Sequence, residues 1–458
     1  MKAIQRIVSL LTLLTLLLSC VSGCGGSNAP EESESPAVTE QEQTDEQPAE
    51  VEHKDYVAAL KFNPVSQTAK QEVTVKAFID GDTVHFNVPS SVNESGVLKA
   101  RFLAVNTPES TGKIEEYGKK ASAFTREKLT GATSIIIESE DNIWNPDSTG
   151  DRYLVWVWYR TSDTEEYRCL NMEILQNGLA IANSTANNRY GDLCMAALNQ
   201  AKAEKLNVYS GEKDPDFYYG DAIEQTLLEL RSNIESYNGM KVAFNGVVTM
   251  NASNTVYVES YDAETDLYCG ISVYYGYGLS GAGLDILSVG NEVRIVGTVQ
   301  YYELGGTYQI SDVSYRAMKP DDPSNLQKIS EGHSAAYRLT DAATFAGDVT
   351  FSTEEGDITL PYAQLALGST LTMQGLTVVD AYTTDNEDSS SKGAMTLTCE
   401  ADGVQVSVRT VVLRDGEGNV ITADAYLGKT IDVMGVVDFY DGNYQIKVFS
   451  ADKITVHE

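Results

Sequence analysis

Two short stretches in the first third of the chain combine residue types that act on phosphates. The first, AFIDGDTV at residues 77–84, is an apolar strand that breaks at Asp-Gly, a pair typical of tight hairpin turns, and leaves Asp82 at the mouth of the turn. The second, LKARFLAVNTPES at residues 98–110, has Arg101 inside an apolar strand, and Pro108 keeps the following turn extended. Hard cations prefer oxygen ligands, and a guanidinium suits a phosphate. The two stretches therefore indicate metal-assisted chemistry on a phosphate.

The residues in and around these stretches predict strands and helices. Apolar alternation indicates five strands, at residues 73–79, 83–88, 98–105, 134–138 and 153–159. Helical spacing indicates three helices, at residues 118–129, 170–177 and 191–205, with Gly178 closing the second. The first three strands would present both stretches at strand ends.

In chain order, these segments resemble those of the staphylococcal nuclease (thermonuclease) family. That family carries its site on an IDGDTV hairpin, an R-x-x-x-x-[DN]-T-P-E strand end and a later arginine before an apolar strand, here Arg152 in GDRYLVWVW. Two further collinear segments, at residues 170–180 and 199–210, extend the resemblance to residues 72–211. It implies an OB-type barrel with the site on one face.

The resemblance also implies a role for each residue of the site. Asp82 would ligate calcium through its carboxylate, and Thr107 through its backbone carbonyl. Glu109 would position or deprotonate the attacking water. Arg101 and Arg152 would bind the phosphate with their planar guanidinium groups. An isolated arginine more often forms an ion pair at the surface. Here both arginines occur in the same motif order as Asp82 and Glu109, which favours the phosphate role.

Three departures from the best-known family member affect the metal and the substrate. Asn106 replaces the second calcium carboxylate, so calcium should bind more weakly or another divalent cation should replace it. Gly150 and Ser184 stand where that enzyme has the tyrosines that flank its nucleotide. The residues that could stack on a nucleotide instead are Tyr153, Trp156, Trp158 and Tyr190, although aromatic residues in or beside a strand more often pack in the core. Three lysines, Lys113, Lys119 and Lys120, form a basic cluster near the site. A helix start exposed to solvent explains them equally well.

The N-terminus predicts export and a lipid anchor. Residues 1–24 have a basic start and a short apolar run, as in a secretion signal, and VSGC resembles a bacterial lipobox that would lipidate Cys24. Cys20 is a competing site, and an ordinary cleaved signal is the alternative. Residues 25–54 are acidic and rich in Ser, Pro and Gln, which predicts a disordered tether. We therefore expect a protein anchored by lipid on the extracellular face of the bacterial cell membrane.

The composition of the 458 residues predicts a mainly β protein with some α-helix and about three domains. The resemblance implies that the first domain is an OB-type nuclease barrel, and the two segments after it resemble further OB-like barrels. Residues 213–458 carry 14 Lys and Arg against 36 Asp and Glu, which disfavours long-range attraction of a polyanion. Without a Cys-x-x-Cys or Cys/His spacing, zinc is not expected. Cys169 and Cys194 would form either a disulfide or two buried thiols.

After the thermonuclease-like domain, placed at residues 55–212, two β segments repeat each other. The divisions predicted there are a linker and helix at 213–238, OB-like module 1 at 239–318, a linker at 319–338 and OB-like module 2 at 339–458. The linker's helix would span residues 221–237, and residues 339–365 would add a hairpin to module 2. Module 1 is rich in tyrosine, but its acidity favours a spacer or another partner over nucleic acid.

Two functions follow from this pattern. The first is a surface-anchored, calcium-dependent, sugar-nonspecific nuclease that hydrolyses extracellular DNA and RNA, with no protein partner predicted. The second is a non-catalytic, nuclease-like binding lipoprotein. The set of Asp82, Arg101, Glu109 and Arg152 favours the first, because a binding module has no need of a water-activating glutamate.

Overall fold

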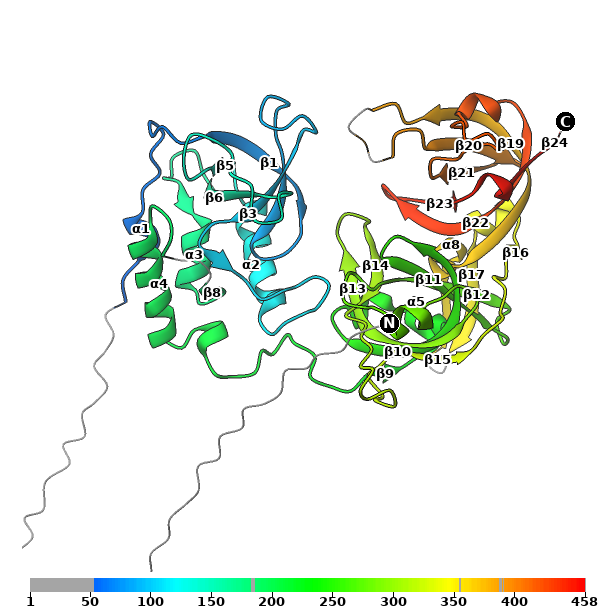
Figure 1. The fold of residues 1–458 in the computed structure, drawn as a ribbon, viewed down its shortest axis with the longest axis horizontal. Coiled ribbons are helices and arrows are strands. Elements are labelled where there is room, and N and C mark those ends of the chain that lie inside the picture. Colours follow the sequence, from blue (N-terminus) through cyan, green and yellow to red (C-terminus); the bar gives the residue numbers. More distant parts are fainter. Residues whose placement is uncertain (1–52, 183–185, 354–355, 387–388, 390, 458) are drawn as a thin grey trace, which may run out of the picture. The chain divides into compact units, whose positions relative to one another are not determined.

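Three closed five-stranded barrels follow one another along the chain (Figure 1). The structure is a computed structural model and describes residues 53–182, 186–353, 356–386, 389 and 391–457. It is mainly β, with 39% strand and 18% helix, which confirms the predicted fold class. The predicted signal, Cys24 and nearly all of the tether lie outside the described residues. Among the residues described, no helix is long and apolar enough to cross a membrane.

The first barrel consists of the five strands that the sequence predicts. They are β1 (Lys70–Phe78), β2 (Thr83–Asn87), β3 (Val97–Phe102), β5 (Ser134–Glu138) and β6 (Tyr153–Arg160). The order β3-β2-β1-β5-β6 closes through a parallel pairing of β3 with β6, and β7 (Arg168–Cys169) extends the sheet. Strand β3 ends earlier than predicted because Ala104 turns the chain at φ 66°. The residues after it form β4 (Val105–Asn106), which pairs with β8 (Ile181–Ala182).

Helices cover the first barrel at the three predicted places. They are α2 (Gly118–Thr130), α3 (Leu170–Gln176) and α4 (Gly191–Ala203); the sequence analysis missed the short α1 (Tyr56–Ala59), which Asp55 caps, and η1 (Asn207–Tyr209). Asn171 anchors α3 to the barrel, since its amide donates to the carbonyls of Leu103 and Val155 and accepts from the amide of Val157.

The second and third barrels have the same strand path as the first. The second contains β10 (Lys241–Ala252), β11 (Thr255–Asp262), β12 (Leu267–Tyr274), β13 (Glu292–Tyr302) and β14 (Thr307–Ser311), with β9 (Ile223–Glu224), β15 (Gln327–Ser330) and α6 (Ala282–Ile286) around it. The third contains β19 (Thr370–Thr383), β20 (Met395–Ala401), β21 (Val404–Thr410), β22 (Thr430–Tyr440) and β23 (Asn443–Val448), with β16 (Arg338–Leu339), β24 (Ile454–His457), η3 (Ala423–Ala425) and η4 (Ala451–Lys453). In each barrel the third and fifth strands form the one parallel pair, as in an OB fold.

One glycine in the second barrel and one in the third lie at equivalent places, where two strands cross closely. A Cβ on Gly297 of β13 would lie 2.7 Å from the carbonyl oxygen of Ser311, and one on Gly435 of β22 would lie 2.7 Å from that of Lys447. No side chain fits there, so the glycines allow both barrels to close.

The predicted helix at residues 221–237 is wrong in extent. Residues 223–224 form β9, and the helical part is divided into α5 (Leu227–Ser232) and η2 (Ile234–Tyr237). Thr226 starts α5 with a capping box to Glu229, which places the helix N-terminus later than predicted. Of the four apolar residues expected on its buried face, Leu227, Leu230 and Ile234 lie in the core, whereas Ile223 lies in β9 and is half-buried.

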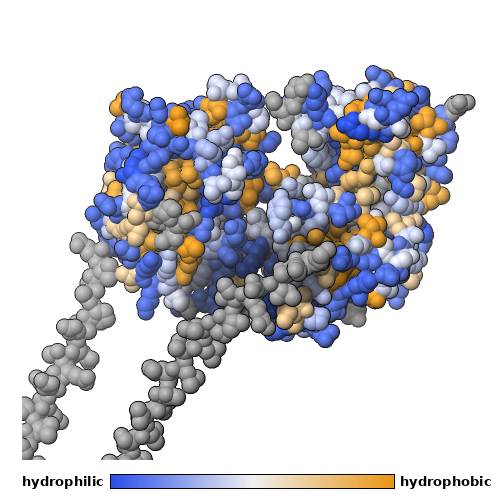
Figure 2. Space-filling model, viewed as in Figure 1, coloured by the Kyte–Doolittle hydropathy of each residue, from blue (hydrophilic) through white to orange (hydrophobic). Residues whose placement is uncertain are grey.

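The second and third barrels share one continuous apolar core. The backbones touch closely, since a Cβ on Gly270 would lie 2.2 Å from the amide nitrogen of Ser369. The buried Glu259 accepts from the amides of Ala336 and Thr370, and the buried Arg231 donates to the carbonyl of Gln364. The predicted extra hairpin is present as β17 (Asp348–Thr353) and β18 (Gly356–Pro361), between α7 (Ala342–Ala346) and α8 (Tyr362–Leu365). On the face shown in Figure 2, hydrophilic residues surround separate apolar patches.

Candidate active site

The turn between β1 and β2 holds Asp82 in the interior. The amides of Ile79 and Asp80 donate to the carbonyl of Thr83, and the amide of Asp82 donates to Asp80 Oδ1 at 3.0 Å. Gly81 is required here for space, because a Cβ would lie 2.9 Å from both Ala121 Cβ and the side chain of Thr107. The sequence analysis attributed the glycine to turn conformation alone.

Asp82 is fully buried, and three residues donate hydrogen bonds to its carboxylate. Thr83 Oγ1 donates to Asp82 Oδ1 at 3.0 Å, and the amide of Thr107 donates to Oδ2 at 2.7 Å. The guanidinium of Arg101 donates through Nη1 to Asp82 Oδ1 and through Nη2 to Asn106 Oδ1. One arginine therefore bridges the two side chains that the resemblance assigns to the metal.

Burial and neighbouring charges shift the pKa values of this cluster. Burial raises the pKa of the Asp80 carboxyl, although the charge of Arg101 opposes the shift. Burial also raises the pKa of Glu109, and the nearby charge of Asp80 adds to it. The pKa of Arg101 is lowered by burial, against the pull of the carboxylates. Glu109 is exposed at the surface, but its raised pKa makes it a better proton acceptor than an ordinary glutamate.

Arg152 precedes the part of β6 that pairs in parallel with β3, where Arg101 lies opposite Leu154, and its charge acts on Arg101. Its side chain is held by Asp147, with Nη2 to Oδ2 at 2.7 Å and Nε to Oδ2 at 2.8 Å. About a third of the Arg152 side chain is exposed, so the guanidinium remains open to a phosphate. The sequence analysis did not find Asp147, although an acidic residue five positions before the arginine offered a signal.

The loop that follows Glu109 is held by a residue of the second barrel. Gln300 of β13 accepts from the amide of Gly112 at 3.1 Å and donates to the carbonyl of Ser110 at 3.0 Å. Gln300 is 4% exposed, so both hydrogen bonds are shielded from water. On the other side of the loop, the Glu109 carbonyl accepts from the amide of Glu115 at 2.8 Å. No local pattern marks Gln300, because it lies 190 residues away from Ser110 in the sequence.

The donor set fits a hard cation. The side-chain oxygens of Asp82 and Asn106 converge on a single guanidinium, and oxygen is the ligand that such a cation prefers. Thr107 Oγ1 is buried and has no hydrogen-bond partner in the described part of the chain. Within that same part, no group of three or more His, Cys, Asp or Glu side chains could hold a metal ion. The protein thus offers few ligands, and water and phosphate oxygens would have to complete the coordination.

The structure corrects two of the proposed stacking residues. Trp156 and Trp158 are fully buried, and their indole nitrogens donate to Glu140 and Glu138 at 2.8 Å, so neither can stack on a nucleotide. Tyr190 and Tyr153 are half-buried, and Tyr190 packs edge-on against Trp156 at 4.9 Å.

The basic cluster and the cysteines have structural partners. Lys119 donates to the carbonyl of Asn238 at 2.9 Å, Lys113 lies 3.6 Å from Glu115, and Lys120 lies over the ring of Tyr117. Cys169 and Cys194 are both free and buried, so of the two alternatives the structure contains two thiols. Burial raises the pKa of both, that of Cys194 to about 12.

These features define a class: an OB-type barrel with buried carboxylates, oxygen donors and arginines around the turn between its first two strands. Residues 99–211 match the family model of the staphylococcal nuclease homologues, and the chain therefore contains a domain of the staphylococcal nuclease family, followed by two further barrels. The match starts inside β3. The hairpin with Asp82 precedes it, and the pairing of Thr83 with Arg101 joins the hairpin to the matched part.

Proposed function

We propose that the chain is a metal-dependent nuclease that hydrolyses phosphodiester bonds of DNA and RNA. One observation carries the proposal: Asp82, Arg101, Glu109 and Arg152 lie together at one end of a nuclease-family barrel, although the sequence separates them by up to 70 residues. Two guanidinium groups beside a carboxylate of raised pKa form a site for a phosphate and an attacking water.

Each residue has a role in this reaction. Arg101 and Arg152 bind the non-bridging phosphate oxygens and stabilise the negative charge that develops there. Glu109 orients the attacking water and accepts its proton. Asp82 and Asn106, with the carbonyl of Thr107, would hold the divalent cation, calcium or another hard ion. When bound, such a cation adds positive charge near the phosphate and lowers the pKa of a coordinated water.

Digestion by the purified full chain tests this proposal. We expect single-stranded DNA, duplex DNA and RNA to be cut in the presence of calcium or another divalent cation, and all cutting to stop with a chelator. Retention of the oligonucleotides without hydrolysis, with every divalent cation tried, would instead favour the non-catalytic binding protein.

We further propose that the protein is anchored on the extracellular face of the cell membrane through Cys24. The support is the basic, apolar and lipobox-like order of residues 1–24. Cys24→Ser should release the protein from the membrane fraction, because the acylation site is lost. Cys20→Ser is the matched control and should leave it membrane-bound. Unchanged retention of the Cys24→Ser variant would contradict this anchor.

A further inference from the structure

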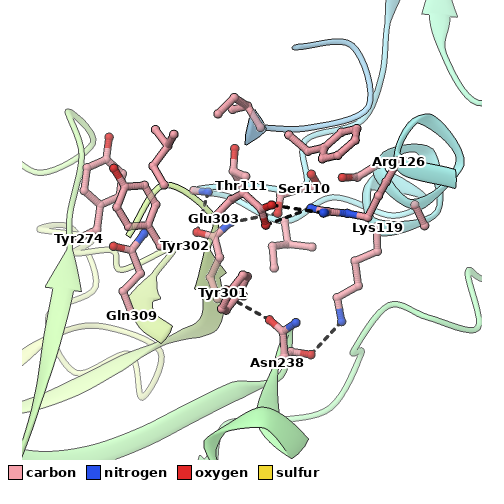
Figure 3. A pocket seen from close by; sticks show the side chains of 18 of the residues that line it. Ser110, Thr111, Lys119, Arg126, Asn238, Tyr274, Tyr301, Tyr302, Glu303 and Gln309 are labelled. Carbon is pink, nitrogen blue, oxygen red and sulfur yellow. Dashed lines mark hydrogen bonds and ion pairs between the residues drawn. The ribbon is translucent and has the colours of Figure 1, made fainter. Parts of the chain in front are cut away.

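A cavity of about 820 Å³ lies directly beside the loop that follows Glu109 (Figure 3). One wall consists of residues 110–112 and of α2, with Lys119 and Arg126. The opposite wall comes from the second barrel and includes three tyrosines, Tyr274, Tyr301 and Tyr302. The candidate active site and this cavity are thus joined through one short loop.

The tyrosine wall lies at the part of an OB barrel that other OB folds use to bind oligonucleotides. In such folds the loops between strands one and two and between strands four and five border the ligand. In the second barrel these loops are residues 253–254 and 303–306. The cavity is lined by Thr255 and Tyr302, which flank these loops, and by Glu303 and Leu304 within the second loop.

The rings in this wall are held in place yet accessible. Tyr302 is 43% exposed, and its ring packs over Gly305, where an added Cβ would lie 2.6 Å from the ring. Figure 3 shows Tyr274 beside Tyr302, and Tyr301 is 40% exposed while its ring meets Tyr308 at 5.1 Å. A ring fixed by its neighbours loses little entropy when a flat ligand stacks on it.

The charge of the cavity differs from that of the whole chain. The chain has 66 acidic residues against 33 Lys and Arg, whereas the cavity is lined by Lys119, Arg126 and His85 against the single carboxylate of Glu303. Burial lowers the pKa of His85, so this side chain stays neutral near pH 7. Arg126 pairs with Glu303 at 3.0 Å, but 44% of its side chain is exposed, and a phosphate could compete for it. The cavity is therefore a place where the acidic chain tolerates a polyanion.

We propose that this cavity binds the single-stranded continuation of the nucleic acid strand, with its bases stacked on Tyr274 and Tyr302 and its phosphates near Lys119 and Arg126. The proposal rests on the proposed nuclease function, because it adds a strand-holding site to that active site. Unpaired bases are required, since a duplex hides the base faces that tyrosine would contact. The second barrel then acts as the part of the nuclease that selects single strands.

Binding of a fluorescent twelve-nucleotide oligo(dT) to the full chain tests the proposal, with chelator present so that no cleavage occurs. Tyr274→Ala/Tyr302→Ala should weaken binding by at least about tenfold, because stacking of each base contributes strongly. Tyr302→Phe keeps the ring and should bind within about twofold of the wild type. Tyr277→Ala is the matched control, because Tyr277 is 93% exposed on the same barrel and does not line the cavity.

The salt dependence separates stacking from charge. The two alanine changes should leave the slope of log affinity against log salt unchanged, whereas Lys119→Met and Arg126→Met should each reduce it by about 0.7. The proposal would be overturned if the double alanine variant bound oligo(dT) as tightly as the wild type. It would also be overturned if Tyr302→Phe lost as much affinity as the double variant, or if the wild type preferred the matching duplex. Binding that depends on the tyrosines in a chain that cuts no substrate would refute the nuclease function and leave this site standing.

Discussion

The first two barrels have the same strand path but differ in chemistry at the same register position. In the first, Thr83 begins the second strand and lies opposite Arg101, which bridges Asp82 and Asn106. In the second, Thr255 begins the second strand and lies opposite Tyr274, which lines the cavity. One barrel presents charge for the phosphate, and the other presents a ring that suits a base. The fold fixes where a site can form, and the residues at that place decide what it binds.

The largest expected effect should come from Glu109. Glu109→Gln should lower turnover by roughly 100- to 1,000-fold without loss of folding, because the proton acceptor is removed. Single-turnover rates with saturating substrate measure the effect, and thermal melting checks the fold. Glu264→Gln, an exposed glutamate of the second barrel, is the matched control and should keep full activity. A Glu109→Gln variant of wild-type rate would remove this residue from the mechanism.

A smaller effect is expected at Asn106. Asn106→Asp adds a second ionised ligand beside Asp82, so the calcium concentration that gives half-maximal activity should fall by about tenfold. Calcium titrations of both proteins at fixed pH measure the change, and Asn245→Asp, an exposed asparagine of β10, controls for the added charge. If the Asn106→Asp variant needs as much calcium as the wild type or more, Asn106 is not a weakened calcium ligand.

The contact between the two barrels can be tested at Gln300. Gln300→Ala removes both hydrogen bonds that hold the loop after Glu109, so turnover should fall about threefold to tenfold and unfolding should become easier by about 1–2 kcal/mol. The matched control is Gln445→Ala, which removes a buried glutamine of β23 in the third barrel and its hydrogen bond to Asp438. Equal turnover in the two variants would show that the nuclease barrel positions Glu109 unaided.

The smallest effect concerns Glu259, the buried carboxyl between the second and third barrels. Burial raises its pKa above the ordinary 4.5, although the amides of Ala336 and Thr370 oppose the shift. The folded chain therefore holds this proton more tightly than the unfolded chain, and the contribution to stability is lost as the pH rises from about 4.5 through the raised pKa. Urea unfolding between about pH 4.5 and 7 should show a steeper decline for the wild type than for Glu259→Gln. Parallel curves would contradict this assignment.

The sequence predicts local structure well where one pattern decides it. Strand β5 coincides with the prediction because an apolar run is bounded by polar turns, and the site residues follow from a collinear motif. For Trp156 and Trp158 the core interpretation is correct, as the unbroken apolar run around them, typical of a strand buried on both faces, indicates. The break before α5 was also readable, because Thr226 and Glu229 have capping-box spacing.

The remaining features depend on contacts between distant parts of the chain. Gln300 sits in an ordinary strand sequence, and only the folded chain places it on the loop of Ser110. The cavity likewise combines α2 with tyrosines of the second barrel, which no local pattern relates. The tyrosines themselves were visible in the sequence, but the net charge of the region argued against nucleic acid there. A charge summed over a domain averages out a local exception such as this cavity.

The hydrogen bonds of Gln300 also affect the order in which the chain folds during synthesis. A chain is synthesised from its N-terminus at about 5–20 residues per second, and the 190 residues between Ser110 and Gln300 therefore take roughly 10–40 seconds. The first barrel can fold during this interval, but the loop after Glu109 gains its two bonds only when β13 has emerged and folded. The newly synthesised chain therefore passes through a period in which its first barrel is formed and the loop after Glu109 is still loose.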